Sequence, residues 1–159
     1  MTGDGLSVVV QNAAGNSDTP AASLIEGWAR RVFTDRAGEL VVRIVAEAES
    51  ALLNESYRGK SGPTNVLAFP VGEMPAAPGE AEPLGDIAIC ASIVAREAAE
   101  QGKPLNAHWA HMVIHGCLHL SGYDHETEAE AAVMEARERV LLAAIGIADP
   151  YDCLASQPG

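Results

Sequence analysis

The sequence predicts an α+β fold, with a small mixed β-sheet of about four strands packed with helices. Two observations support this class. Four short runs rich in Val, Ile and Leu have the composition of strands. Helical periodicity marks the segments before, between and after these runs. Short strands interspersed with clustered helices are typical of a sandwich built on one sheet.

The first half of the chain alternates strand and helix patterns. A β-branched run that ends in turn residues predicts a strand at 6–12. Residues 16–33 change to a helical period, with Pro20 at a favoured first helical position. A run rich in Val and Ile predicts a second strand at 39–48, and residues 49–64 then predict a short helix that closes in a loop.

The second half leads into longer helices. We expect a third strand at 65–71 and a fourth at 86–91, separated by a surface loop rich in proline and glycine at 72–85. No internal repeat or linker interrupts this order, so we expect a single domain over 1–159. The remaining elements are helices at 92–104, about 105–120 and 126–147, followed by a loose tail at about 148–159.

Composition limits the classes of function. The net charge of −12 is opposite to that of a protein that holds nucleic acid by a general electrostatic field. A nucleic-acid role would therefore need a local basic site or a docking partner. The absence of a secretory signal and of any apolar run near ~18 residues predicts a cytoplasmic protein without a membrane partner.

The number and spacing of the cysteines do not fit a disulfide framework. Cys90, Cys117 and Cys153 are odd in number and form no C-x-x-C pair, which fits a reducing compartment. Cys117 lies within a histidine-rich segment and could be a thiolate ligand. In a regular helix, however, it lies about 200° around from His115, which favours a small buried residue.

Three histidines in this segment have the spacing of a metal site on a central helix and the turn that follows it. His115 and His119 are four residues apart on one helical face, where both can reach one ion at the ~2.0–2.1 Å of zinc–nitrogen bonds. Helix continuation would carry His125 ~15 Å away along the axis, so Gly122 would have to turn the chain back. Three nitrogen ligands leave one open position, as in catalytic zinc sites.

Other residues could support these ligands. Asp124 and Asp86 are candidates to orient a ligand histidine by hydrogen bonding, although each could equally be a turn or strand-end aspartate. His111 shares the face of His115, so an ion between these two is the competing arrangement. Only an ion between His115 and His119 has a glycine turn nearby that can return another histidine to it. We therefore interpret His111 as either a buried histidine or one that supports a ligand, and His108 as a helix-start residue.

The spacing H-x3-H-x2-G-x2-H is also that of the metzincin proteases, in which a glutamate after the first histidine is the general base. Here that position is Gly116, and Met134 lies in a helical pattern rather than a Met-turn. Peptide hydrolysis is therefore the weaker interpretation.

The stretch "HWAHMVIHGCLHLSGYDH" (108–125) instead closely resembles the YbeY family of bacterial metal-dependent endoribonucleases. "LNESYRGKSGPTNVLAFP" (53–70) and "LGDIAIC" (84–90) agree with the same family in the same order, and the resemblance extends from about residue 6 to 147. Some members carry Asp in the T-D-V-L-S-F segment, where this chain has Asn65 and Ala68. The resemblance implies His115, His119 and His125 as ligands of one Zn²⁺ per chain, and Arg58 as the functional arginine.

The resemblance also implies an activity: single-strand-specific cleavage of ribosomal RNA, at the 3′ end of the small-subunit RNA, and a part in ribosome quality control. Expected partners are single-stranded ribosomal RNA and the ribosome, small-subunit proteins or assembly factors. Candidates for a local basic cleft are Lys60, Arg43 and Arg96, beside Arg58. The alternatives are a ribosome-assembly factor with a structural zinc site and a zinc-dependent hydrolase of peptides or small molecules.

Overall fold

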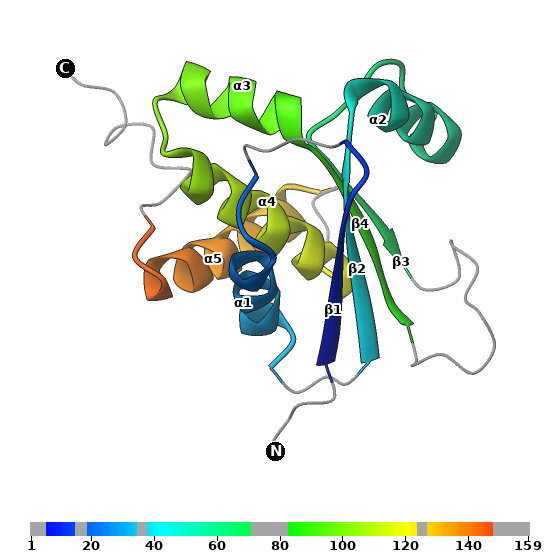
Figure 1. The fold of residues 1–159 in the computed structure, drawn as a ribbon. Helices are drawn as coiled ribbons and strands as arrows, with labels where there is room; N and C mark the ends of the chain where they lie inside the picture. The colour runs from blue at the N-terminus through cyan, green and yellow to red at the C-terminus, as the bar shows by residue number, and fades with distance from the viewer. Residues whose placement is uncertain (1–5, 15–18, 35–37, 71–82, 124–126, 148–159) are drawn as a thin grey trace.

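The computed structural model describes residues 6–14, 19–34, 38–70, 83–123 and 127–147. Within these ranges, a four-stranded mixed sheet lies against a group of helices, and a further short helix lies at one end of the sheet (Figure 1). No helix in the described ranges has the length and apolar character needed to cross a bilayer. The predicted α+β class with one small mixed sheet is confirmed.

The sheet has the order β1-β2-β4-β3. Strands β1 (Leu6–Asn12), β2 (Gly38–Val45) and β4 (Pro83–Cys90) run parallel, and β3 (Val66–Pro70) is antiparallel to β4 at the edge. Along β2, fully buried residues such as Leu40, Val42 and Ile44 alternate with partly exposed ones, so one face of this strand is covered more completely than the other.

One long helix organises the others. Helix α4 contacts α1, α3 and α5 as well as β3 and β4, and the side chains of Trp109, Ile114 and Leu118 along it are fully or almost fully buried. In Figure 1 it lies between the sheet and α5. The helices are α1 (Ala22–Val32), α2 (Glu47–Leu53), the π-helical turn η1 (Asn54–Arg58), α3 (Ala91–Gln101), α4 (Leu105–Leu120) and α5 (Glu128–Ala144).

The two faces of the sheet belong to different apolar clusters. Ile87 and Ile89 of β4 join the large cluster that contains the core of α4. Ala88 and Cys90, which alternate with them, join a smaller cluster that Leu53 of α2 covers. The face on which a β4 side chain lies therefore decides whether it can reach the histidines of α4.

At Gly116, α4 lies close against the sheet. A Cβ atom there would lie 3.0 Å from Cγ2 and 3.1 Å from Cδ1 of Ile87. Such distances are shorter than ordinary carbon contacts of ~3.5–4.0 Å. Packing therefore disfavours the glutamate that follows the first histidine in the metzincin pattern, because a side chain at this position would be directed at Ile87 of the sheet.

Several predicted boundaries of strands, loops and helices differ from those in the structure. The strand predicted at 39–48 ends at Val45, because α2 begins at Glu47, where acidic residues favour the N-terminus of a helix. The loop predicted at 72–85 gives way to β4 at Pro83, which pairs with β2. The helix predicted at 92–104 begins one residue earlier and ends before the left-handed Gly102. Most of the predicted loop, with the predicted tail, lies outside the described residues.

We predict that Gly116→Glu lowers the free energy of unfolding by at least about 2 kcal/mol, because it overpacks the contact with Ile87 and buries a charge. Chemical denaturation of the purified variant measures this change. Asn106→Glu, which adds the same side chain at an exposed position of α4, is the control. Equal stability of the two variants would contradict the packing argument.

Candidate active site

Helix α4 carries its histidines along one face. His108, His111, His115 and His119 follow one another at three- or four-residue intervals, and consecutive ring centroids are 6.1, 6.2 and 4.9 Å apart. His111, His115 and His119 line one cleft. His108 lies in the first turn of the helix, as predicted, and is buried.

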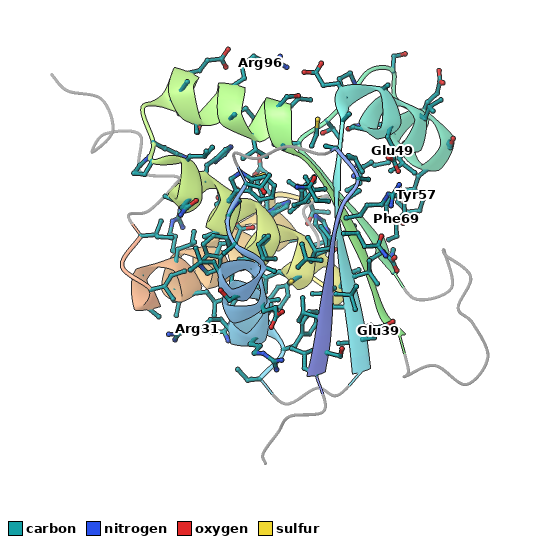
Figure 2. All side chains as sticks on the ribbon, in the orientation of Figure 1. Arg31, Glu39, Glu49, Tyr57, Phe69 and Arg96 are labelled. Carbon is teal, nitrogen blue, oxygen red and sulfur yellow. The ribbon has the colours of Figure 1, made fainter. Side chains whose placement is uncertain are left out.

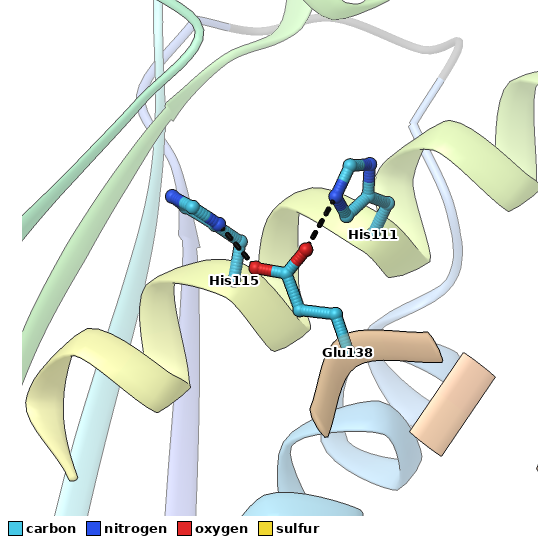
Figure 3. A group of neighbouring side chains, drawn as sticks. All are labelled: His111, His115 and Glu138. Atoms are coloured by element: carbon cyan, nitrogen blue, oxygen red, sulfur yellow. Dashed lines mark hydrogen bonds and ion pairs between the residues drawn. The ribbon is translucent and has the colours of Figure 1, made fainter. Parts of the chain in front are cut away.

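A carboxylate from α5 binds two of these histidines (Figure 3). Oε1 of Glu138 lies 2.9 Å from Nε2 of His111, and Oε2 lies 2.5 Å from Nδ1 of His115. The Glu138 side chain is fully buried. Glu138 was not among the residues predicted from the sequence, although a signal exists: it is the acidic member of the buried face that Met134 and Leu141 also form.

His111, His115 and Glu138 lie close enough to be considered as a ligand set, since one donor atom from each is within 4.8 Å of the others. The individual distances nevertheless fit hydrogen bonds better. Two ligand atoms on one tetrahedral zinc are separated by about 3.3 Å when each bond is ~2.0–2.1 Å long. The separations of 2.5 and 2.9 Å are those of hydrogen bonds.

His115 and His119 form a second pair of neighbouring rings that could hold a metal ion. Both rings line the cleft with centroids 4.9 Å apart, and both residues are one helical turn apart on α4. A carboxylate on the second nitrogen of His115 is the arrangement that metal-binding histidines usually show. The predicted third ligand His125 and the candidate Asp124 lie outside the described residues.

The opposite wall of the cleft is basic and polar. The cleft has a volume of about 860 Å³. Its lining brings Arg58 and Lys60, two of the predicted basic residues, to the same space as the histidines. Tyr57, Asn65 and Tyr123 also line it. The histidine motif and the Arg58–Lys60 motif, which are separate in the sequence, therefore line one cleft.

Side chains of α2 and η1 hold the loop that follows Arg58 and carries Lys60. The hydroxyl of Ser50 donates to the carbonyl of Thr64 and accepts from its N–H, each at 2.9 Å. The side-chain amide of Asn54 donates to the carbonyl of Gly62 at 2.9 Å. Gly59, with φ of 69°, ends the π-helical turn in the left-handed conformation. The hydrogen bonds of Ser50 and Asn54 hold the C-terminal part of the loop that follows Arg58.

Two other predicted basic residues do not line the cleft. Arg43 lies on β2 and pairs with Glu49, with Nε 2.7 Å from Oε2. Arg96 projects from α3 (Figure 2), with NH1 3.6 Å from Oε2 of Glu47. Each is engaged with a carboxylate away from the histidines, so the positive charge of the cleft comes from Arg58 and Lys60.

Two further sequence candidates also lie away from the cleft. Asp86 alternates with Ile87 on β4, so it lies on the sheet face opposite α4. Burial and, secondarily, the Glu39 carboxylate raise the pKa of Asp86. Cys117 is fully buried, and burial raises the pKa of its thiol, which therefore stays neutral. The interpretation of Cys117 as a small buried residue is confirmed.

Asn65 connects the cleft to α3 and α4. Its side-chain amide donates to Oε1 and Oε2 of Glu97 at 3.1 and 3.3 Å. Nε2 of His108 lies 2.8 Å from the same Oε1. The backbone carbonyl of Asn65 accepts from Cys90 at 2.9 Å. An amide suits this position because it can donate to the carboxylate, which an aspartate cannot do when ionised.

Comparison with known proteins gives a consistent result. The family model described as "Endoribonuclease YbeY" matches residues 11–146. A Halorhodospira halophila protein named "Endoribonuclease YbeY" is 55% identical over 149 residues, which cover 92% of this chain and 96% of the relative. A Methylococcus capsulatus protein of the same name is 52% identical over 138 residues, covering 87% and 91% of the two chains.

The fold also matches a solved structure. The solution structure of a Thermotoga maritima protein aligns with a TM-score of 0.53 and covers 96% of this chain and 97% of that chain. The two sequences are 23% identical, so this match supports the fold alone.

We predict that Asn65→Asp destabilises the protein by about 1 kcal/mol, because it replaces a donor to Glu97 by a second carboxylate. Urea denaturation measures the loss. The double variant Asn65→Asp/Glu97→Gln should recover most of it, since the amide at position 97 can donate to the new aspartate. No recovery in the double variant would show that the contact does not carry the effect.

Asp86→Asn should raise the melting temperature near neutral pH. The raised pKa means that ionised Asp86 disfavours the folded state. Below the unfolded-state pKa both states are protonated, and the variant gains nothing. The gain should appear as the pH rises through the folded-state pKa. Thermal unfolding over a pH series tests this, with the exposed Glu100→Gln as the charge-removal control. A gain equal at all pH values would contradict the argument.

Proposed function

The chain belongs to the YbeY family of endoribonucleases, and from the geometry of its cleft we propose that it cleaves single-stranded ribosomal RNA, with one zinc ion bound. The maturation of the small-subunit RNA at its 3′ end and ribosome quality control are the processes we propose for it. One observation carries this proposal: the histidine face of α4 and the Arg58–Lys60 loop line the same cleft.

His115, His119 and His125 are the residues we propose to hold the zinc ion. Support comes from the paired rings of His115 and His119 and from the carboxylate that holds the other nitrogen of His115. A bound zinc ion supplies Lewis-acid polarisation of a phosphoryl oxygen. The neutral, buried thiol of Cys117 does not compete for this role.

Arg58 is the residue we propose to bind the phosphodiester. A guanidinium group can donate two parallel hydrogen bonds to phosphate oxygens and stabilise the charge that develops on them. Lys60 adds a second positive charge in the same cleft. Local placement of these two side chains reconciles RNA binding with a net charge of −12.

The absence of a side chain at Gly116 favours RNA over peptide as the substrate. Peptide hydrolysis by the metzincin pattern needs a glutamate at this position, which the chain lacks and which packing against Ile87 disfavours. RNA carries a 2′-hydroxyl group that can act as its own nucleophile. The aromatic rings of Tyr57 and Tyr123 also line the cleft, and unstacked bases of single strands can stack on such rings.

The net charge also favours help from a partner. A chain with a charge of −12 gains no general attraction to RNA, so we propose that ribosomal or assembly proteins bring it to its substrate. The buried free thiols of Cys90 and Cys117 suit a reducing compartment, which supports a cytoplasmic location.

We predict that Arg58→Ala keeps one zinc per chain but cleaves a ribosomal RNA fragment with a single-stranded tail about 10²–10³-fold more slowly, the cost of losing one charge-stabilising donor. His115→Ala should lose both zinc and cleavage. Metal analysis and gel-resolved RNA cleavage provide the two measurements. Arg31→Ala, which removes an exposed arginine of α1, is the matched control.

Equal cleavage by all four proteins would assign the activity to a contaminant and would favour the assembly-factor alternative. Tight zinc binding in wild type without any cleavage would favour a structural zinc site. Hydrolysis of peptides in place of RNA would favour the third alternative.

A further inference from the structure

Glu138 has the least exposed carboxylate of the described residues. Its side chain is fully buried, although the other acidic side chains that form ion pairs in the described ranges are 28% exposed or more. Taking an ionised carboxylate out of water costs several kcal/mol unless hydrogen bonds compensate. Each of its two oxygens lies within hydrogen-bonding distance of an imidazole nitrogen, and an ionised carboxylate can only accept in such contacts. Its place in the core therefore depends on these two histidines.

The two hydrogen bonds use different ring nitrogens. Glu138 contacts His111 through Nε2, the nitrogen at the far end of that side chain. It contacts His115 through Nδ1, the nitrogen nearer to the backbone. A neutral imidazole carries one N–H and one lone pair. Donation from Nδ1 of His115 consequently places the lone pair of that ring on Nε2.

The asymmetry distinguishes the two candidate metal positions that the histidine spacing leaves open. The end of the His111 side chain is directed at Glu138, whereas the end of the His115 side chain is directed away from it (Figure 3). The His115 ring lies 4.9 Å from that of His119, compared with 6.2 Å from that of His111. An ion bound by Nε2 of His115 is thereby placed on the side of His119.

We propose that Glu138 is a positioning residue that holds His115 as the Nδ1–H tautomer, occupies the end of His111, and so selects the His115–His119 pair for metal binding. This inference rests on the proposed function only in taking a metal ion to be bound. Its first test needs neither metal nor RNA.

The tautomer can be measured directly in the metal-free full-length protein by long-range ¹H–¹⁵N NMR of the histidine rings. We expect protonated Nδ1 and unprotonated Nε2 at His115 in the wild type. Glu138→Gln, which keeps the shape of the side chain but offers one accepting oxygen, should shift the His115 ring towards the Nε2–H form. Glu135→Gln, at a partly exposed position of α5, should leave the tautomer unchanged.

The second test measures zinc affinity by competition with a chelator. We expect Glu138→Gln to bind zinc about 10–100-fold more weakly, the usual loss when a carboxylate partner of a ligand histidine is removed. His111→Gln should retain one zinc ion per chain, and His119→Gln should lose it. The opposite result, with loss in His111→Gln and retention in His119→Gln, would identify His111, His115 and Glu138 as the ligands and overturn the proposal.

The outcomes separate this inference from the proposed function. An Nε2–H tautomer at His115 in the wild type overturns the inference, whatever the RNA activity. An Nδ1–H tautomer in a protein that cleaves no RNA supports the inference and contradicts the proposed function alone. Thermal unfolding shows whether Glu138→Gln folds. If it does not, the wild-type tautomer and the pair His111→Gln and His119→Gln decide the question.

Discussion

The close contact between α4 and the sheet is the constraint on which the rest of the structure depends. At Gly116 the helix approaches β4 so closely that a Cβ atom would meet Ile87 at 3.0 Å. Helix α4 runs through the core, where Trp109, Ile114 and Leu118 are buried on different sides of it. The histidine face is oriented towards the cleft, and the contact disfavours an acidic side chain after His115.

The cleft lies between two walls that are held in place by different interactions. One wall is α4, whose orientation follows from its packing against the sheet. The other is a loop without regular structure, which Ser50 and Asn54 hold through side-chain bonds to backbone carbonyls. Loops positioned by such a scaffold commonly carry binding groups. Because Arg58 ends η1 just before this loop and Lys60 lies on it, a strongly acidic protein acquires a locally basic site.

Helix α5 adds a polar contact to an otherwise apolar interface. Most of its buried face consists of apolar residues such as Met134 and Leu142, and Glu138 interrupts this face. Removal of one partner from a buried, hydrogen-bonded charge is costly, so the two helices and the two histidines depend on one another. The same contact that joins α5 to α4 also orients the rings that face the cleft.

The sequence by itself determined the elements with strong local signals. Helix α4 begins and ends where periodicity and the following turn residues predict, and the face shared by His111, His115 and His119 follows from helical geometry alone. Strand composition was enough for the fold class. Element boundaries were less accurate where two elements follow without a loop, as at Glu47 and Ala91, because no turn residue marks the change there.

Only the tertiary structure decided which distant residues share the site. Arg58 and Lys60 line the cleft, whereas Arg43 and Arg96 pair with glutamates elsewhere, and residue type does not distinguish these four. The contact of Glu138 with histidines 23 and 27 residues away required the docking of α5 on α4. Periodicity gives the face of each element on which a side chain lies. The element that this face meets is set by packing between segments far apart in the chain.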